Sequence, residues 1–300
     1  MRIVILSKGP GNYSTKRLKK VAIERGHDVK VVDYARCYIS VEQDKPKVRY
    51  EGENISGVDA IIPRISANYT KYGSSIVRQF EMMGVYTTTK SIALSRARDK
   101  LRSLQILAKS GVGIPKTVFS RETDEVDDIL DMLGGAPVII KVAKGTHGKG
   151  VVLAETKKAA KAVMQAFYVE GVNFLIQEFI AESAGSDIRA FVVGNQVVAS
   201  MKRQSLDDDF RSNLHMGGEG KAIKLTETEK KMALKAAKAM GLQICGVDMI
   251  RSEQGPMVLE VNASPGFRIE QVTNRDIATK IIEYVEKNAK QRNRKDRIGA

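Results

Sequence analysis

The sequence lacks the segments that carry a protein into or across a membrane. Its longest hydrophobic runs fall far short of the roughly 20 apolar residues that a membrane-spanning helix needs. The apolar start, Met1–Leu6, is followed at once by the polar residues Ser7 and Lys8, so it does not read as a signal-peptide core. The two cysteines, Cys37 and Cys245, lie far apart and show no pairing pattern. We therefore expect a cytoplasmic protein with reduced thiols and no membrane contact.

The charge balance is the unusual feature of the composition. The 300 residues, of which 43% are hydrophobic, suffice for two or three domains with ordinary cores. Their net charge of +14 favours an anionic partner such as a nucleotide, an acidic peptide or RNA. Much of this charge is spread through predicted helices, which is equally typical of plain solvated surface. The densest block predicts a disordered tail over residues 288–300 and consists of Lys287, Lys290, Arg292, Arg294, Lys295 and Arg297.

Hydrophobic periodicity predicts an α/β chain with some α+β character. Near the N-terminus, strands alternate with helices, which is typical of a small parallel sheet, and Gly111–Pro115 marks a break between domains. The expected helices are residues 14–25, 74–83, 91–110, 125–133, 157–167, 227–240 and 275–287. The expected strands are residues 2–7, 29–32, 58–62, 116–120, 137–142, 151–153, 174–180, 187–193, 196–201, 247–250 and 257–261.

The loop after the first strand imitates a dinucleotide-binding fingerprint. Gly9-Pro-Gly11 supplies two glycines and Asp33 ends the second strand, but Ser14 stands where a third glycine belongs. A partial match of this kind is weak. We do not expect a nicotinamide cofactor.

The last predicted hairpin brings oxygen-bearing side chains together. If its loop is the three residues Glu253–Gly255, Asp248 lies directly opposite Glu260, and Asn262 shares the face of Glu260. Two facing carboxylates repel, so a cation between them is expected if the site is buried. Oxygen ligands without Cys or His suit magnesium or manganese. The alternative is an ordinary hairpin with acidic residues on its wet face.

A second candidate site follows the strand at 137–142. Lys141 lies in an apolar run and precedes the glycine-rich segment Gly145-Thr-His-Gly-Lys-Gly150. A buried lysine needs a partner, and a phosphate under the backbone amides of that loop would provide one. The spacing is not that of a Walker loop. The alternative is a hairpin turn with a lysine that extends to solvent.

Two further segments and one arginine are weak signals when each is taken alone. Ile176-Gln-Glu-Phe-Ile180 reads as a strand that runs into a linker, where backbone groups could contact an adenine edge, although it is equally a generic strand. Arg211-Ser-Asn213 lies in a polar loop, which alone predicts a mobile surface segment. Arg203 is a candidate for clamping a substrate carboxylate, because a guanidinium can bind one bidentately; the alternative is a surface residue.

These features follow one another along the chain: a strand lysine, a glycine-rich loop, a Glu-Phe linker, Arg-Ser-Asn and the acidic hairpin. Together they resemble the ATP-grasp fold. The closest resemblance is to its RimK family, the ATP-dependent glutamate ligases that act on a ribosomal small-subunit protein. The resemblance covers essentially the whole chain apart from the basic tail. It rests on the segments Ile62-Pro-Arg-Ile65, Arg78-Gln-Phe-Glu-Met82, Ala97-Arg-Asp-Lys-Leu-Arg102, Asp209-Phe-Arg-Ser-Asn-Leu-His215 and Glu260-Val-Asn-Ala-Ser-Pro-Gly266.

The resemblance implies a domain plan. A pre-ATP-grasp parallel α/β domain would occupy residues 1–103, and an ATP-grasp domain residues 104–287. The latter would divide into subdomains of about 104–177 and 178–287, with ATP between them. Family members often assemble as tetramers, so a homo-tetramer is expected, and the tail could contact ribosomal RNA weakly.

The resemblance also implies roles for individual residues. A peptide C-terminal carboxylate would be activated as an acylphosphate, which the amine of L-glutamate attacks, with ADP and phosphate as products. Arg211 and Lys141 would be catalytic, and Arg203 and Ser264 would contact substrate. The ATP contacts would be Lys100, Lys141, Glu178, Phe179, Asp187, Arg211, Ser212 and Asn213, and two Mg²⁺ or Mn²⁺ ions would bind Asp248, Glu260 and Asn262.

Some features leave the acceptor open. His147, Lys149 and Gln204 depart from the family pattern on the acceptor side. One alternative is therefore an ATP-grasp ligase that joins an amino acid to a small metabolite or a carrier protein. Another is a non-catalytic RNA-binding protein, which the net charge favours but which leaves Asp248, Glu260 and Asn262 unexplained. The number of glutamates added and the preferred metal are not indicated by the sequence.

Overall fold

A computed structural model describes residues 1–300 apart from 122–124, 144–149, 184, 206–218 and 290–300. Its α-helices are α1 (Tyr13–Glu24), α2 (Thr70–Met82), α3 (Ser91–Arg98), α4 (Lys100–Lys109), α5 (Val126–Leu133), α6 (Lys157–Val169), α7 (Glu227–Met240), α8 (Arg268–Thr273) and α9 (Ile277–Ala289). Short 3₁₀ helices cover Tyr34–Arg36, Ala67–Tyr69 and Ala181–Ser183. Within the described residues, every helix is too short or too polar to cross a membrane.

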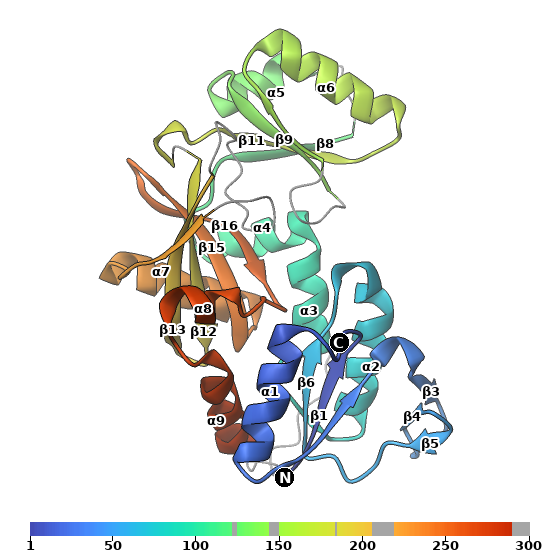
Figure 1. Cartoon of the computed structure of the whole chain (residues 1–300). Coiled ribbons are helices and arrows are strands. Elements are labelled where there is room, and N and C mark those ends of the chain that lie inside the picture. The colour runs from blue at the N-terminus through green and yellow to red at the C-terminus, as the bar shows by residue number, and fades with distance from the viewer. Residues whose placement is uncertain (122–124, 144–149, 184, 206–218, 290–300) are drawn as a thin grey trace.

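The strands within the described residues form four sheets. They are β1 (Arg2–Ser7), β2 (Asp28–Val32), β3 (Tyr38–Ser40), β4 (Lys47–Tyr50), β5 (Glu53–Asn54), β6 (Ala60–Arg64), β7 (Tyr86–Thr87), β8 (Thr117–Ser120), β9 (Val138–Val142), β10 (Val151–Ala154), β11 (Phe174–Glu178), β12 (Ser186–Val193), β13 (Gln196–Gln204), β14 (Glu219–Ala222), β15 (Ile244–Ser252) and β16 (Gly255–Asn262). Three parts follow one another along the molecule, with β1 and β6, then β12 and β15, then β9 and β11 at their centres (Figure 1).

The N-terminal sheet is parallel, in the order β2-β1-β6-β7, as the alternation of strands and helices predicts. Its central strand β1 is buried on both faces because helices cover both. Ile3 and Ile5 pack with α1 and α9, whereas Val4 and Leu6 point the other way, toward α2 and α3. This alternation is the period of two that a strand imposes on its side chains.

A small antiparallel sheet, β3-β4-β5, is inserted between β2 and β6. The sequence did not predict it, because its strands are two to four residues long and carry mostly polar or half-exposed side chains. Such strands lack the hydrophobic alternation on which strand prediction depends.

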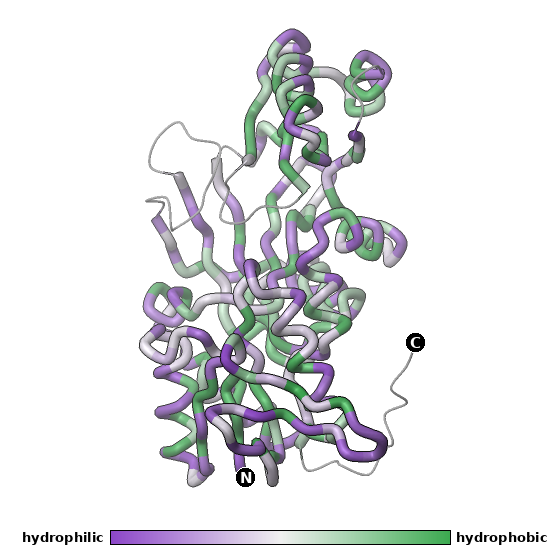
Figure 2. The backbone as a smooth tube through the Cα atoms, turned by 90° about the vertical axis from the view of Figure 1, so that its right-hand side faces the viewer, coloured by the Kyte–Doolittle hydropathy of each residue, from purple (hydrophilic) through white to green (hydrophobic). Residues whose placement is uncertain are grey.

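The unit formed by β8–β11 with α5 and α6 has a hydrophobic core of its own. Its sheet runs antiparallel in the order β10-β9-β11-β8. The core contains Leu130, Ile140, Met164 and Phe174 and shares no buried residue with the other two clusters. After a quarter turn this unit still projects from the rest of the chain (Figure 2). Its hydrophobic core is therefore separate from the other two clusters.

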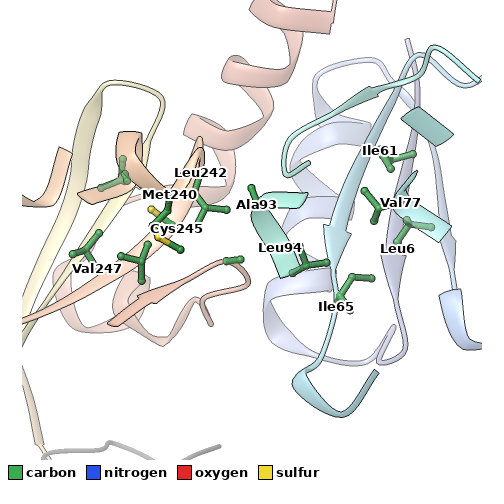
Figure 3. Close-up of a cluster of buried hydrophobic side chains, with 14 of the residues drawn as sticks. Leu6, Ile61, Ile65, Val77, Ala93, Leu94, Met240, Leu242, Cys245 and Val247 are labelled. Atoms are coloured by element: carbon green, nitrogen blue, oxygen red, sulfur yellow. The ribbon is translucent and has the colours of Figure 1, made fainter. Parts of the chain in front are cut away.

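The remaining parts share their cores. The third large sheet, β14-β13-β12-β15-β16, is antiparallel, and its β12–β13 hairpin turns at Gly194 and Asn195 as predicted. Ala93 and Leu94 of α3 lie between Ile65 of the N-terminal domain and Leu242 beside the C-terminal sheet (Figure 3). This packing fixes the N-terminal domain against the sheet that carries the predicted metal ligands.

The predicted helix over 91–110 is wrong in one respect, because the structure divides it into α3 and α4. Asp99 interrupts it with an extended backbone, and its carboxylate accepts a hydrogen bond from the Arg102 amide at 3.0 Å. Aspartate is a strong N-cap residue, so a new helix begins where the pattern alone predicts a continuous one. The break places Lys100 at the first position of α4.

The C-terminal helix α9 is tied to the N-terminal domain by charge as well as by packing. Arg25 donates to Glu286 through Nε at 2.8 Å and Nη2 at 2.6 Å, and His27 Nε2 lies 2.8 Å from the same carboxylate. Hydrogen bonds from Arg25 and then His27 lower the pKa of Glu286 to about 2, although partial burial opposes the shift.

Replacing Glu286 by glutamine should lower the free energy of unfolding by about 1 kcal/mol at neutral pH, because the pair is partly exposed. A carboxyl group whose pKa is depressed on folding stabilises the protein above its unfolded pKa and loses that effect as the pH falls through its folded pKa. The difference between the two proteins should thus narrow from about pH 4.5 toward pH 2. Urea unfolding at several pH values measures it. Glu283→Gln, at a more exposed carboxylate 3.9 Å from Arg25, is the matched control, and equal losses in both variants would contradict the assignment.

Candidate functional site

The hairpin of β15 and β16 places Asp248 directly opposite Glu260, as the sequence predicts, but by a different route. The predicted three-residue loop is wrong, because Ser252 pairs with Gly255 and leaves a two-residue turn. A β-bulge between Asp248 and Met249 then adds the residue that the shorter turn omits. Gly255 begins β16 with φ of +106°, a backbone angle that favours glycine. The two deviations cancel, so the carboxylates still face each other.

Asp248 is held between two arginines. Arg189 on β12 donates through Nε at 2.7 Å and Nη2 at 2.5 Å, and Arg203 Nη2 on β13 lies 2.9 Å from the same carboxylate. Desolvation alone would raise the pKa of Asp248, but Arg189 and Arg203 hold it well below its usual range. This carboxylate therefore remains ionised, and its charge is already compensated.

Arg203 also pairs with Asp187, its cross-strand partner. Its Nε donates to Asp187 Oδ1 at 2.6 Å, and Nη2 donates to Oδ2. Desolvation raises the pKa of Asp187 in spite of this pair. Arg203, predicted to clamp a substrate carboxylate, thus contacts two carboxylates of its own chain, and Asp187, predicted at the ribose, lies in the same network. The Asp187 carboxylate has further lone pairs and the Arg203 guanidinium has further N–H donors, so both predictions stand as predictions.

Glu260 is the carboxylate of this group whose charge is not compensated by an ion pair among the described residues. Its side chain is accessible, yet surrounding protein desolvates it and raises its pKa, and the neighbouring Asp248 raises it further. The positive charges of Arg98, Lys100 and Lys141 all act on it. Positive charges from α3, α4 and β9 therefore all interact with the one negative charge of Glu260.

Lys141 and Lys100 approach this point from two sides. Lys141 on β9 donates to Gln177 Oε1 at 2.6 Å, and Gln177 in turn donates to Thr117 Oγ1 at 2.8 Å. Lys100 Nζ reaches the carbonyl of Val142 at 2.9 Å. Desolvation lowers the pKa of Lys141 to about 8 and also lowers the pKa of Lys100. Two partly dehydrated ammonium groups at one place suit an anion with several oxygens.

The glycine-rich segment follows Lys141 in the sequence and ends at Gly150. Gly150 has φ of +71°, and a Cβ atom there would lie 2.5 Å from Val142 Cγ2, so this position requires glycine. Its carbonyl accepts from the Val142 amide at 2.9 Å, which closes the turn between β9 and β10. The remaining loop residues, 144–149, and the predicted site residues Arg211, Ser212 and Asn213 lie outside the described residues, as does the tail from 290 onward.

The predicted adenine residues lie at the join between two units of the chain. Glu178 ends β11 and Phe179 follows it, and the Lys116 amide donates to Glu178 Oε1 at 2.7 Å. The backbone of Glu178 also donates to the Lys116 carbonyl at 3.0 Å. The side chains of Glu178 and Phe179 are both half-buried. A planar base at this join would contact both the unit that carries Lys141 and the sheet that carries Glu260.

Apart from Arg203, sequence reasoning missed the arginines that surround the hairpin. Arg189 was not singled out at all, and Arg64 and Arg98 were noted only within motifs. Arg64 donates to the Pro265 carbonyl at 2.7 Å, just after Asn262, whose Oδ1 accepts from the Ser264 amide at 3.0 Å. Desolvation, and then the charge of Arg98, lowers the pKa of Arg64 to about 10. The available signal was a charged residue at the end of a buried strand.

The donor atoms of the hairpin fit a hard cation. In the described ranges no group of three His, Cys, Asp or Glu side chains is placed to hold a metal ion, so the hairpin offers two carboxylates and the Asn262 amide instead. Asp248 and Glu260 lie close enough to raise each other's cost of ionisation, which a cation would relieve. Three oxygen donors leave coordination positions for water and phosphate, as magnesium prefers.

These features define an ATP-grasp enzyme: a small antiparallel unit with a lysine, a larger antiparallel sheet with paired carboxylates, and a parallel domain before them. Residues 97–285 match the RimK-like ATP-grasp domain, and residues 1–94 match the RimK pre-ATP-grasp domain. The chain therefore belongs to the RimK family, and it is an ATP-dependent ligase. Both the predicted family and the predicted fold are confirmed.

Relatives agree with this assignment. A probable alpha-L-glutamate ligase of Hydrogenovibrio crunogenus is 54% identical over 298 residues, which cover 99% of each chain. One from Vibrio cholerae serotype O1 is 52% identical over 298 residues, again 99% of each chain. Relatives of this similarity exclude the alternative of a non-catalytic RNA-binding protein.

Solved structures agree in fold. The ATP-grasp ligase PsnB complexed with minimal precursor, Mg and ADP has a TM-score of 0.75 at 20% identity, over 96% of this chain and 98% of PsnB. The macrocyclase MdnC bound with the precursor peptide MdnA, from Microcystis aeruginosa, has a TM-score of 0.72 at 16% identity, over 95% of this chain and 99% of MdnC. At these identities the likeness shows the fold alone.

Proposed function

We propose that this protein adds L-glutamate to the C-terminal carboxylate of an acceptor peptide, either a ribosomal small-subunit protein or a growing poly-glutamate chain. The observation that carries the proposal is the convergence of Lys100, Lys141 and Glu260 between two units of the chain. The names of the relatives support glutamate as the added amino acid.

In this reaction the protein mainly positions charges. Lys100 and Lys141 would neutralise phosphate oxygens of ATP, and Glu178 and Phe179 would hold its adenine. A nucleotide held in this way would lie between the units of about 104–177 and 178–287. Asp187 would accept from the ribose through lone pairs that Arg203 does not use.

Metal ions, either two Mg²⁺ or two Mn²⁺, would be held by Asp248, Glu260 and Asn262 and would supply charge neutralisation at the phosphates. Because Arg189 and Arg203 already compensate Asp248, Glu260 would contribute the larger part of the net charge that holds them. Ser212 and Asn213 would complete the phosphate contacts.

The chemistry consists of two transfers. An oxygen of the acceptor carboxylate attacks the γ-phosphorus, the bond to the β-phosphate oxygen breaks, and ADP leaves. The glutamate amine then attacks the carbonyl carbon of the acylphosphate, loses a proton and expels phosphate. Arg211 would stabilise the oxyanion of this second step, and Lys141 would stabilise the charge of the first. Exclusion of water around Lys141 protects the acylphosphate from hydrolysis.

Incubating the protein with ATP, Mg²⁺, glutamate and acidic acceptor peptides should yield acceptor whose mass has grown by whole glutamyl residues, with matching ADP release. Mass spectrometry of the acceptor measures this. Omission of ATP and replacement of glutamate by aspartate are the controls. Incorporation of another amino acid, or glutamate transfer to a small metabolite or carrier protein alone, would contradict the proposal. A cytoplasmic location, a homo-tetramer and weak contact of the tail with ribosomal RNA stay predictions.

A further inference from the structure

Two arginines meet where the N-terminal domain adjoins the turn that follows Glu260. Arg64 is the last residue of β6, and Arg98 is the last residue of α3. Arg64 Nη2 donates to the Pro265 carbonyl at 2.7 Å and to Ser14 Oγ at 3.2 Å. Arg98 Nη2 donates to the Ile65 carbonyl at 2.8 Å. Neutral backbone and hydroxyl oxygens thus hold both guanidinium groups in place without cancelling their charges.

Both arginines keep unused hydrogen-bonding capacity. Among the described residues, Arg98 Nε is buried without a partner, and so is the hydroxyl of Ser264, the residue before Pro265. A guanidinium has five N–H donors, and the described contacts use few of them. In the part of the chain that the structure describes, neither Arg64 nor Arg98 forms an ion pair with a carboxylate. Burying a charged group without a counter-charge is unfavourable, so the arrangement is incomplete as it stands.

The surrounding residues do not supply the missing counter-charge for Arg64 and Arg98. Arg189 and Arg203 are balanced by Asp187 and Asp248. The carboxylate that remains nearby is Glu260, whose single negative charge acts on Arg98, Lys100 and Lys141 together. The two lysines, held at Val142 and Gln177, suit phosphate. An anion from outside is therefore expected at Arg64 and Arg98.

We propose that Arg64 and Arg98, with the Ser264 hydroxyl, bind a substrate carboxylate that is not itself phosphorylated. A planar carboxylate matches guanidinium donors bidentately, and Ser264 can add a hydrogen bond. Its place beside the turn after Glu260 puts it next to the reacting groups without occupying the phosphate positions. The inference rests on the proposed function, in which both glutamate and an acidic acceptor carry carboxylates that the reaction leaves unchanged.

The test uses steady-state kinetics of Arg98→Lys, Arg98→Gln and Arg64→Lys, with KM measured separately for glutamate, acceptor and ATP. Loss of a charge-assisted clamp should raise the KM of one carboxylate substrate roughly 10- to 100-fold. The KM for ATP should stay within about twofold, because the lysines are untouched. Arg78→Gln, an exposed arginine of the same domain, is the matched control. Calorimetric binding of glutamate in the presence of ADP and Mg²⁺ provides a readout without turnover.

The outcomes separate cleanly. A raised KM for glutamate, with weakened binding of glutamate in calorimetry, assigns the site to glutamate, and a raised KM for the acceptor alone assigns it to the acceptor. Unchanged constants for both, or an equal rise in all three, overturn the proposal. Arg98→Lys retains the positive charge, and its thermal unfolding shows whether a loss reflects misfolding. Absence of ligation by the unaltered protein would instead refute the proposed function.

Discussion

Glu260→Gln should abolish ligation while leaving the fold intact. The carboxylate is desolvated, faces Asp248 and forms no ion pair within the described residues, so no packing or pairing depends on its charge. Glutamine keeps its shape and removes only the negative charge that would hold the metal ions. We expect turnover to fall by roughly 10²- to 10³-fold or more. The free energy of unfolding should change little, because the repulsion from Asp248 and the attraction to Arg98, Lys100 and Lys141 disappear together.

Glutamate-dependent ADP release and urea unfolding measure the two halves of this expectation. Glu253→Gln is the matched control, because it makes the same chemical change in the exposed turn of the same hairpin. Turnover at the unaltered rate in the Glu260 variant would remove Glu260 from the metal site and would refute the central part of the assignment.

Lys141→Ala should weaken ATP binding roughly 10- to 100-fold, the range expected for loss of one desolvated, charge-assisted contact. The folded state should lose little, since a buried ammonium group held by one amide oxygen is itself costly. Competition with a fluorescent nucleotide measures the affinity. Lys157→Ala, on an exposed helix of the same unit and paired with Asp127 at 3.1 Å, is the control. Equal affinities in the Lys141 variant and the control would contradict the role.

The pH dependence of ATP binding gives the same prediction a second test. With a pKa of about 8, Lys141 of the free protein is charged at pH 7 and mostly neutral at pH 9. A phosphate favours the charged form, so the affinity should be highest below pH 8 and fall as the pH rises through that value. Nucleotide titrations between pH 7 and pH 9 follow this fall, and the Lys141→Ala protein should show a much flatter profile. A profile equally steep in both proteins would assign the effect to another group.

Much of the fold follows from local patterns. Strands β1, β9 and β11 are continuous apolar runs, and the hairpin of β12 and β13 turns at a Gly-Asn pair, so each was predicted within a few residues. The short polar strands β3–β5 carry no such pattern. The break at Asp99 was missed because a capping side chain competes with a helical period that continues on both sides of it.

The candidate site was only half visible in the sequence. Asp248 and Glu260 face each other because a short turn and a bulge offset one another, so the predicted register was right although the predicted loop was wrong. The arginines around them could not be found in this way. Arg189 reaches Asp248 across 59 positions of the chain, and Arg64 reaches Pro265 across 201. Contacts at such separations arise from how sheets and domains pack, which spacing along one chain does not encode.

The separate core of the β8–β11 unit has a consequence for how the enzyme holds together. The N-terminal domain and the C-terminal sheet share buried side chains through α3, so neither can lose its order without exposing the other. The smaller unit has a hydrophobic core of its own, so its order depends less on theirs. A nucleotide bound by Lys100 of α4 and by Lys141 of the β8–β11 unit would link this unit to the rest of the chain. ATP would then act both as a substrate and as a ligand that holds the two units of the enzyme together.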